Sequence, residues 1–175
     1  MNKLRISGEH YDQLINHLYP GDHKEAVAVA LCGRISHNEN HILCVHEVLL
    51  IPYDACYDRK PDLVHWPTEI INPLLEKAAK YNYALLKIHC HPGGGEFFSD
   101  YDNESDQNLF SSIHSWLEVD LPHASCIMLP DKRIFGRFFN ANMQPEVIHQ
   151  ISVAGSTILN WYYDQEKSIQ NDLQI

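Results

Sequence analysis

The residues best suited to chemistry stand close together, between positions 89 and 102. Two histidines, His89 and His91, are separated by one residue, and Ser99 and Asp102 follow three positions apart. Imidazole nitrogen and carboxylate oxygen are the usual ligands of catalytic zinc, which takes three protein groups and leaves one position for water. His89, His91 and Asp102 would supply those three ligands. The residue types and their spacing therefore predict a Zn²⁺ site of the hydrolytic kind.

A strand is the element that must present the two histidines. The apolar run 83–88 leads directly into His89. If this run is a strand that continues past His89, residues two apart project to one face, so His89 and His91 can reach a single ion. Pro92 and the glycines after it then allow the chain to turn sharply toward the next element.

A helix that begins near Ser99 is the second element. It brings Ser99 and Asp102 into one turn, because side chains three apart are neighbours on a helix surface. The same pair also fits a structural interpretation, since a serine three residues before an acidic side chain resembles a capping box, although that motif prefers Glu or Gln. The chain holds twelve histidines, so a chance His-x-His pair is plausible as well. The four residues therefore indicate a metal site only when they are taken together.

The whole pattern resembles the JAMM motif of JAB/MPN-domain metalloproteases. His-x-His with proline directly after it, then seven residues and Ser-x-x-Asp, matches that motif at every position. The resemblance implies Zn²⁺ held by His89, His91 and Asp102. It also implies that Ser99 stabilises the oxyanion and that a glutamate on an upstream strand acts as the general base.

Two glutamates compete for the role of the base. Glu25 precedes the apolar run 26–32, which ends at Gly33 and is similar to the first strand of the family. Glu47 lies in a second strand-like run, 41–51, where an unpaired carboxylate is costly to bury. The spacing from Glu to Gly favours Glu25, and only the resemblance brings it near the histidines.

The resemblance also implies the fold, an α/β sandwich of the JAB/MPN, cytidine-deaminase-like kind with a central mixed, largely antiparallel sheet flanked by helices. A length of 175 residues, 45% of them hydrophobic, suits one well-packed domain and is short for two. We therefore expect a single metalloprotease domain over 1–175, with its motif-bearing core at about 25–140.

Hydrophobic periodicity predicts where the helices and strands lie. The expected helices cover 9–18, 72–81 and 99–117, and the expected strands cover 25–35, 41–51, 83–89, 124–129 and 133–139. Asn72 is the expected cap of the second helix, and Trp116 belongs to the expected buried stripe of the third. Residues 52–67 lack periodicity and predict a long loop, which either forms one wall of a substrate groove or has its Trp66 packed beneath the following helix. The tail after 145 receives no assignment.

Composition narrows the classes of function. A formal net charge of −10 argues against nucleic acid as a partner, because phosphate binding draws on clustered Lys and Arg. No run approaches the ~18 apolar residues of a membrane span, and the start lacks the apolar core of a signal peptide, so we expect a cytoplasmic protein without membrane contact. The five cysteines form no Cys-x-x-Cys pair, which favours reduced thiols.

The resemblance implies a substrate class as well. JAB proteases cut the peptide or isopeptide bond after the C-terminal tail of a ubiquitin-like protein. The chain looks most similar to bacterial, deubiquitinase-like members that accompany E1-like and E2-like enzymes, some of them in antiphage defence. Two alternatives stay open, a non-catalytic MPN scaffold and a RadC-like, DNA-associated JAB protein. The complete residue set disfavours the scaffold, and the acidic composition disfavours DNA.

Overall fold

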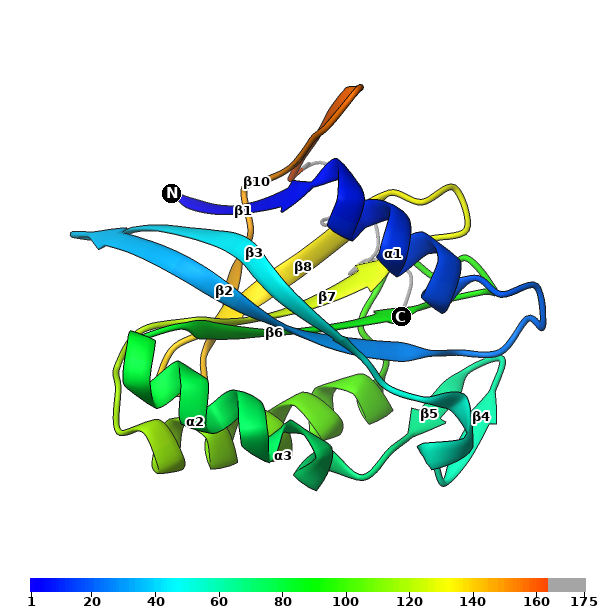
Figure 1. The fold of residues 1–175 in the computed structure, drawn as a ribbon, viewed down its shortest axis with the longest axis horizontal. Coiled ribbons are helices and arrows are strands. Elements are labelled where there is room, and N and C mark those ends of the chain that lie inside the picture. The colour runs from blue at the N-terminus through cyan, green and yellow to red at the C-terminus, as the bar shows by residue number, and fades with distance from the viewer. Residues whose placement is uncertain (164–175) are drawn as a thin grey trace.

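A curled nine-stranded mixed sheet forms the centre of the fold in the computed structural model, which describes residues 1–163 (Figure 1). The strands follow one another across the sheet in the order β11-β10-β1-β3-β2-β6-β7-β8-β9. Their bounds are β1 (Asn2–Ser7), β2 (Val27–His37), β3 (Asn40–Leu50), β6 (Ala84–Cys90), β7 (His123–Met128), β8 (Ile134–Phe139), β9 (Pro145–Val147), β10 (Gln150–Ala154) and β11 (Ile158–Tyr162).

The sheet mixes both kinds of pairing. β1 pairs in parallel with β3 and β10, and β6 pairs in parallel with β7. The other neighbours within the sheet pair antiparallel. The predicted class is therefore confirmed as a mixed α/β fold built on a curled mixed sheet. The single domain over 1–175 stays a prediction.

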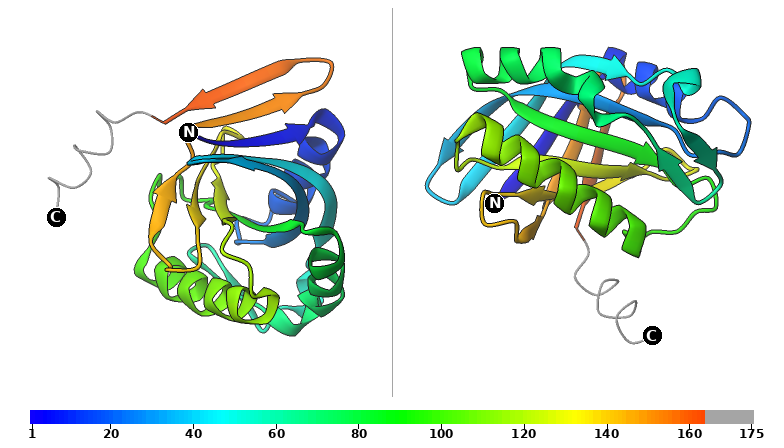
Figure 2. Two further views of the ribbon diagram at one scale, coloured as in Figure 1. Left: turned by 90° about the vertical axis from the view of Figure 1, so that its left-hand side faces the viewer. Right: turned by 90° about the horizontal axis from the view of Figure 1, so that it is seen from below.

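The central strands are buried on both faces, which explains their unbroken apolar character. Every residue of β6 is buried, as are the first six of β2. Helix α1 (Gly8–Leu18) packs on one face, where its Leu14 lies in the same core cluster as Leu86 of β6. Helices α2 (Asn72–Tyr81) and α3 (Asp100–Leu117) pack on the other face, where Phe110 lies in the same core cluster as Leu85 (Figure 2).

The helices agree with their predicted ranges, but the predicted cap of α2 and the predicted burial of Trp116 were wrong. Asn72 does not cap α2, because a 3-10 helix (Thr68–Ile71) runs directly into it and gives Asn72 a helical φ of −51° and ψ of −41°. Trp116 is 53% exposed, because it lies at the edge of the apolar stripe in the last turn of α3. None of the helices within the described range combines the length and apolar character needed to cross a bilayer.

The segment 52–67, predicted as a loop, contains a 3-10 turn (Tyr53–Ala55) and a small separate sheet. This sheet pairs β4 (Asp58–Lys60) with β5 (Leu63–His65) in antiparallel fashion. Three-residue strands are too short to show an alternating pattern, so periodicity did not predict them. Trp66 is buried in the core cluster that contains α2 residues, in agreement with packing beneath the following helix.

The C-terminal part of the described chain extends the sheet beyond β1. β10 lies parallel to β1, with Lys3 opposite Gln150, and β11 returns beside it as the edge strand. The hairpin of β10 and β11 projects from the body of the protein (Figure 2). Residues 164–175, part of the unassigned tail, lie outside the described residues.

Candidate metal centre

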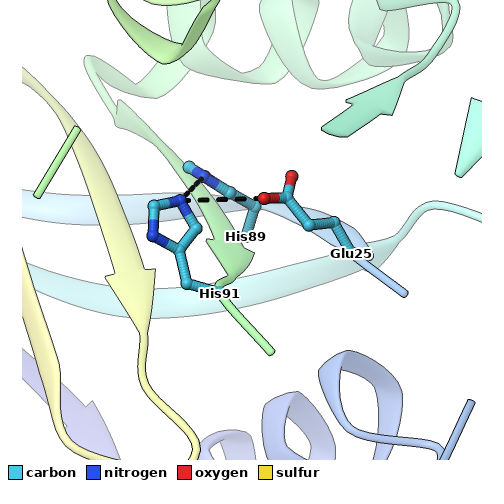
Figure 3. A group of neighbouring side chains, drawn as sticks. All are labelled: Glu25, His89 and His91. Atoms are coloured by element: carbon cyan, nitrogen blue, oxygen red, sulfur yellow. Dashed lines mark hydrogen bonds and ion pairs between the residues drawn. The ribbon is translucent and has the colours of Figure 1, made fainter. Parts of the chain in front are cut away.

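Strand β6 carries both histidines to the face of the sheet that α3 covers. His89 is the next to last residue of β6, and His91 follows just after the strand ends. The two Nε2 atoms lie 3.1 Å apart, and both side chains are buried (Figure 3). The alternation expected for a strand therefore brings the imidazoles to one point, as the spacing predicts.

The glycine loop after His91 fixes the orientation of its ring. The Gly94 amide donates to the His91 carbonyl at 2.9 Å, in a turn where Gly94 has a φ of +85° that favours glycine. The next residue, Gly95, accepts a hydrogen bond from His91 Nδ1 at 2.7 Å. With Nδ1 as the donor, a neutral His91 ring directs the lone pair of Nε2 toward His89.

The first turn of α3 brings the serine and the aspartate. Ser99 caps the helix, and Asp102 completes a capping box by accepting hydrogen bonds from both the amide and the hydroxyl of Ser99, each at 2.8 Å. The same carboxylate lies 3.0 Å from His89 Nε2 and 3.3 Å from His91 Nε2. The capping-box interpretation and the metal-site interpretation of the pair are therefore compatible, because Asp102 both completes the capping box and faces the imidazoles.

Glu25 reaches the site from the extended segment just before β2. Val27 pairs with His89 across the sheet, so a residue two positions earlier lies level with His91. The carboxylate Oε1 of Glu25 is 3.7 Å from His91 Nε2, and the ligand atoms of Glu25, His89 and His91 lie within 4.8 Å of one another (Figure 3). The Glu25 side chain is buried.

The rival base, Glu47, lies elsewhere. It pairs with Leu31 across the β2–β3 ladder, four residues along β2 from Val27. That offset corresponds to about 13 Å along the strand. Its carboxylate forms an ion pair with Lys77 of α2 at 2.8 Å, in a part-exposed position. The structure brings Glu25 to the histidines, whereas Glu47 has a partner of its own.

The electrostatics separate the two carboxylates of the site. Burial raises the pKa of Asp102, but hydrogen bonds from His89 and His91 outweigh it and hold that pKa well below its usual range. Burial raises the pKa of Glu25 to about 8; His91 opposes this shift and the charge of Asp102 adds to it. Burial also lowers the pKa of His89. These shifts leave Asp102 as the permanent anion of the site.

The donor set fits a zinc ion. Two imidazole nitrogens and a carboxylate converge, and a divalent cation would replace the protons that the imidazoles share with Asp102 when no metal is bound. Within residues 1–163, the buried Nδ1 of His89 has no hydrogen-bond partner, and its Nε2 lies 3.0 Å from Asp102, so the ring is held through the nitrogen that would bind the ion. Nitrogen and oxygen ligands in this number are those of catalytic Zn²⁺, which leaves a position open for water.

Sequence reasoning missed Arg59, which holds Glu25 in place. The Arg59 Nε donates to the carbonyl of Glu25 at 2.8 Å, and the Glu25 amide donates to the carbonyl of Lys60 at 2.8 Å. Arg59 also forms an ion pair with Asp22 at 3.0 Å and lies over the ring of Tyr53. No local pattern marks this role of Arg59, because Glu25 and Asp22 lie more than thirty residues away in sequence.

Comparison with known proteins supports one family. The family model described as prokaryotic homologues of the JAB domain matches residues 7–140. The solution structure of protein DSY2949 from Desulfitobacterium hafniense is similar, with a TM-score of 0.55 and 15% identity over 87% of this chain and 94% of that one. At this identity the likeness shows the fold alone. The sequence matches none of the curated proteins with which it was compared.

Proposed function

The chain belongs to the family of prokaryotic homologues of the JAB domain, and on that premise we propose that it is a zinc-dependent hydrolase of the JAMM type. Its proposed reaction is cleavage of the peptide or isopeptide bond that follows the C-terminal tail of a ubiquitin-like protein. The observation that carries this proposal is the convergence of Glu25, His89, His91 and Asp102 at one buried point.

His89, His91 and Asp102 would hold the zinc ion. When bound, zinc lowers the pKa of a coordinated water toward ~7 and polarises a scissile carbonyl. Glu25 would accept the proton of the attacking water on its carboxylate and return it to the leaving amine nitrogen. Burial raises the pKa of Glu25 to about 8 in the protein without metal, and the charge of a bound zinc ion would lower it, so the carboxylate would be ready to accept a proton near neutral pH.

Ser99 would stabilise the oxyanion. Its hydroxyl donates to the Asp102 carboxylate at 2.8 Å and accepts from the Asp102 amide at 3.1 Å. To act on the substrate, the hydroxyl proton turns from Asp102 to the developing negative charge, while the amide contact holds the oxygen in place. One such donor contributes ~10²-fold or more to a rate.

The extended tail of the substrate is proposed to bind in a cavity lined by residues of the β5 segment and α3, whose lining does not include Glu25, His89, His91, Ser99 or Asp102. It has a volume of about 450 Å³ and lies between the β5 segment and α3, with Tyr57, Trp66 and Tyr101 among its lining residues. Tyr101 is next to Asp102 in sequence, and its hydroxyl contacts the carbonyl of Val64 at 3.4 Å. A tail could bind here in extended form along the short strands, as in β-augmentation.

The partners and context are proposals that rest on the family resemblance. We propose a ubiquitin-like protein or its conjugate as the substrate, with E1-like and E2-like enzymes of the same pathway as possible partners. The proposed setting is a bacterial ubiquitin-like conjugation pathway in the cytoplasm, of the kind found in antiphage defence. We propose neither nucleic acid nor membrane as a partner, in keeping with a net charge of −10.

The test is cleavage of a fusion. The purified chain, loaded with Zn²⁺, is incubated with ubiquitin and a panel of bacterial ubiquitin-like proteins, each joined through its tail to a reporter domain. We expect at least one fusion to be cut directly after the tail, with loss of cleavage on chelation and recovery on return of Zn²⁺. His89→Ala should be inactive, whereas His37→Ala, an exposed histidine at the β2–β3 turn, should cleave at the parental rate. Zinc-loaded protein that leaves every fusion intact would favour the scaffold.

A further inference from the structure

A group of three charged residues, two of them buried, lies directly beside the metal centre. Lys87 of β6 and Asp106 of α3 are 3% and 0% exposed, and their Nζ and Oδ1 atoms are 2.7 Å apart. The second oxygen of Asp106 lies 2.7 Å from the guanidinium of Arg137 on β8. One carboxylate therefore ties two strands of the sheet to the helix that covers them.

This group lies between the same two elements as the metal centre, in the neighbouring layer of side chains along β6 and α3. Lys87 precedes His89 by two residues on β6, so the two side chains share a face of the strand. Asp106 follows Asp102 by four residues on α3, so these carboxylates are neighbours along the helix. The contact of 3.0 Å between His89 and Asp102 and the contact of 2.7 Å between Lys87 and Asp106 thus form adjacent layers between the same two elements.

Arg137 extends the group to the loop that joins the two halves of the motif. Its guanidinium lies over the ring of Phe98, 3.7 Å from the centroid, and donates to the Asn103 side chain at 2.7 Å. Phe98 directly precedes the helix cap Ser99, and Asn103 lies in the first turn of α3. Arg137 therefore contacts the chain on both sides of the Ser99–Asp102 pair.

Stability alone does not explain these charges. Removal of charged groups from water is costly, and apolar residues of similar volume often give equal or greater stability than a buried ion pair. An ion pair does fix the separation and direction of its partners more narrowly than apolar contact. Here the separation that it fixes is that between β6 and α3, which carry opposite sides of the metal centre.

We propose that Asp106, together with Lys87 and Arg137, is a positioning group for the metal centre. The Lys87–Asp106 pair holds α3 against β6 at the spacing at which Asp102 contacts both imidazoles. Arg137 fixes the start of α3 through its contact with Phe98. This inference rests on the proposed zinc site, but it does not depend on the identity of the substrate.

The test replaces the pair rather than one partner. Asp106→Asn alone leaves Lys87 charged and buried, and this variant can fail to fold. The double variant Lys87→Met/Asp106→Leu removes both charges and keeps the volume. We expect it to fold, because Arg137 is part-exposed and keeps its hydrogen bond to Asn103, but to bind Zn²⁺ about 10- to 100-fold more weakly in competition with a chelator, as loss of outer-shell support does. The visible spectrum of the Co²⁺-loaded protein should also change, because it reports ligand geometry.

Two further variants complete the test. Arg137→Met leaves the Lys87–Asp106 pair intact, so it should fold, and it should weaken Zn²⁺ binding in the same direction by a smaller factor. The matched control Glu47→Leu/Lys77→Met removes a part-exposed ion pair far from the site and should leave Zn²⁺ affinity and the Co²⁺ spectrum at parental values.

The outcomes separate this inference from the proposed function. Parental Zn²⁺ affinity and Co²⁺ spectrum in a folded double variant, or in Arg137→Met if the double variant does not fold, would overturn the positioning role while leaving the hydrolase intact. Weakened Zn²⁺ binding would support the positioning role even if the parental protein cuts none of the fusions. A parental protein that binds no Zn²⁺ would overturn both.

Discussion

The two carboxylates of the metal centre come from regions of different construction. Asp102 lies in the first turn of α3, held by Ser99 through both oxygen and nitrogen contacts and followed by the buried layer around Asp106. Glu25 lies in an extended segment before β2, and its backbone is held by Lys60 and Arg59 of the small β4–β5 sheet. Asp102 therefore belongs to a helix packed on the central sheet, whereas Glu25 belongs to a segment that is held by the small β4–β5 sheet.

Their electrostatics differ in the same way. Hydrogen bonds from the imidazoles keep the pKa of Asp102 well below its usual range, against the effect of burial. Burial dominates at Glu25 and raises its pKa to about 8. The difference teaches that similar side chains in one site can have distinct tasks: Asp102 is suited to remain a metal ligand, and Glu25 is suited to gain and lose a proton.

Replacement of Glu25, the proposed base, should give the largest effect on turnover. In Glu25→Gln the amide keeps the volume of the side chain but cannot accept the proton of the attacking water. We expect kcat to fall about 10²- to 10⁴-fold, the usual contribution of general acid–base catalysis, with Zn²⁺ stoichiometry unchanged. Rates on a cleaved fusion and metal analysis of the purified protein measure the two quantities. Loss of Zn²⁺ from this variant would break the comparison, because Glu25 would then be the ligand.

Replacement of Asp102 should affect the metal first. Asp102→Asn can still accept the hydrogen bond from the Ser99 amide, so the helix should form, but the anion between the imidazoles is gone. We expect Zn²⁺ affinity to fall by more than the ~10- to 100-fold typical of outer-shell changes. Chelator competition measures it. Asp100→Asn, an exposed acid in the same helical turn, is the matched control and should keep parental affinity.

Ser99 allows the two roles of the first turn to be separated. Ser99→Ala removes both the cap and the proposed oxyanion donor, and we expect kcat to fall ~10²-fold and the free energy of unfolding to fall by ~1 kcal/mol. Ser99→Thr keeps a hydroxyl and a good cap, so it should retain most of both. If Ser99→Ala lowers stability but leaves kcat at the parental value, the serine is a helix cap alone.

The contrast between the two carboxylates also explains what the sequence could reveal. The strand, the tight loop and the helix that carry His89, His91, Ser99 and Asp102 are continuous in sequence, so local spacing predicted their convergence. The choice between Glu25 and Glu47 depends on which of them lies opposite the histidine strand, and strand register is a tertiary property. No spacing rule could supply it, and the resemblance to a family had to do so.

The contacts that support the two carboxylates could not be predicted from local sequence patterns either, because they join residues that are distant in sequence. Lys87 and Asp106 are 19 residues apart, and Arg59 lies 34 residues from Glu25. Asp106 and Arg59 fit an ordinary solvated surface when the sequence is considered alone, and the apolar run around Lys87 does not identify the partner of its charge. Strands β10 and β11 were missed because β10 pairs with β1 across almost the whole length of the chain. Burial and partners of this kind appear only once the fold is known.

The raised pKa of Glu25 gives the metal-free protein a dependence of stability on pH. Burial lifts this pKa from its usual value near 4.5 to about 8, so between these values the folded state holds a proton that the unfolded chain has lost. The free energy of unfolding therefore falls as pH rises through that window, with a slope of ~1.4 kcal/mol per pH unit and a total of about 2 kcal/mol between pH 6 and 8.

Glu25→Gln isolates this contribution from those of the histidines. Urea unfolding of the metal-free parent and of the variant, at pH 6 and at pH 8, gives the difference directly. We expect the variant to lose the part of the pH dependence that belongs to Glu25, and so to be the more stable of the two at pH 8. Parallel pH profiles for the two proteins would mean that Glu25 is already ionised at pH 6, and the contrast with Asp102 would disappear.

The smallest expected effect concerns the connection between Glu25 and the β4–β5 sheet. Arg59→Met removes the hydrogen bond to the Glu25 carbonyl and the ion pair with Asp22, but leaves the Glu25 amide bound to Lys60. A base placed less accurately should lower kcat by about tenfold, while Zn²⁺ affinity stays parental because His89 and Asp102 are held by β6 and α3. Lys60→Met, which keeps the backbone carbonyl and removes only an exposed ion pair with Asp58, is the control. If Arg59→Met lowered Zn²⁺ affinity by the same factor as kcat, the position of the metal ligands on β6 and α3 would depend on the Glu25 segment, and the contrast between the two regions would be wrong.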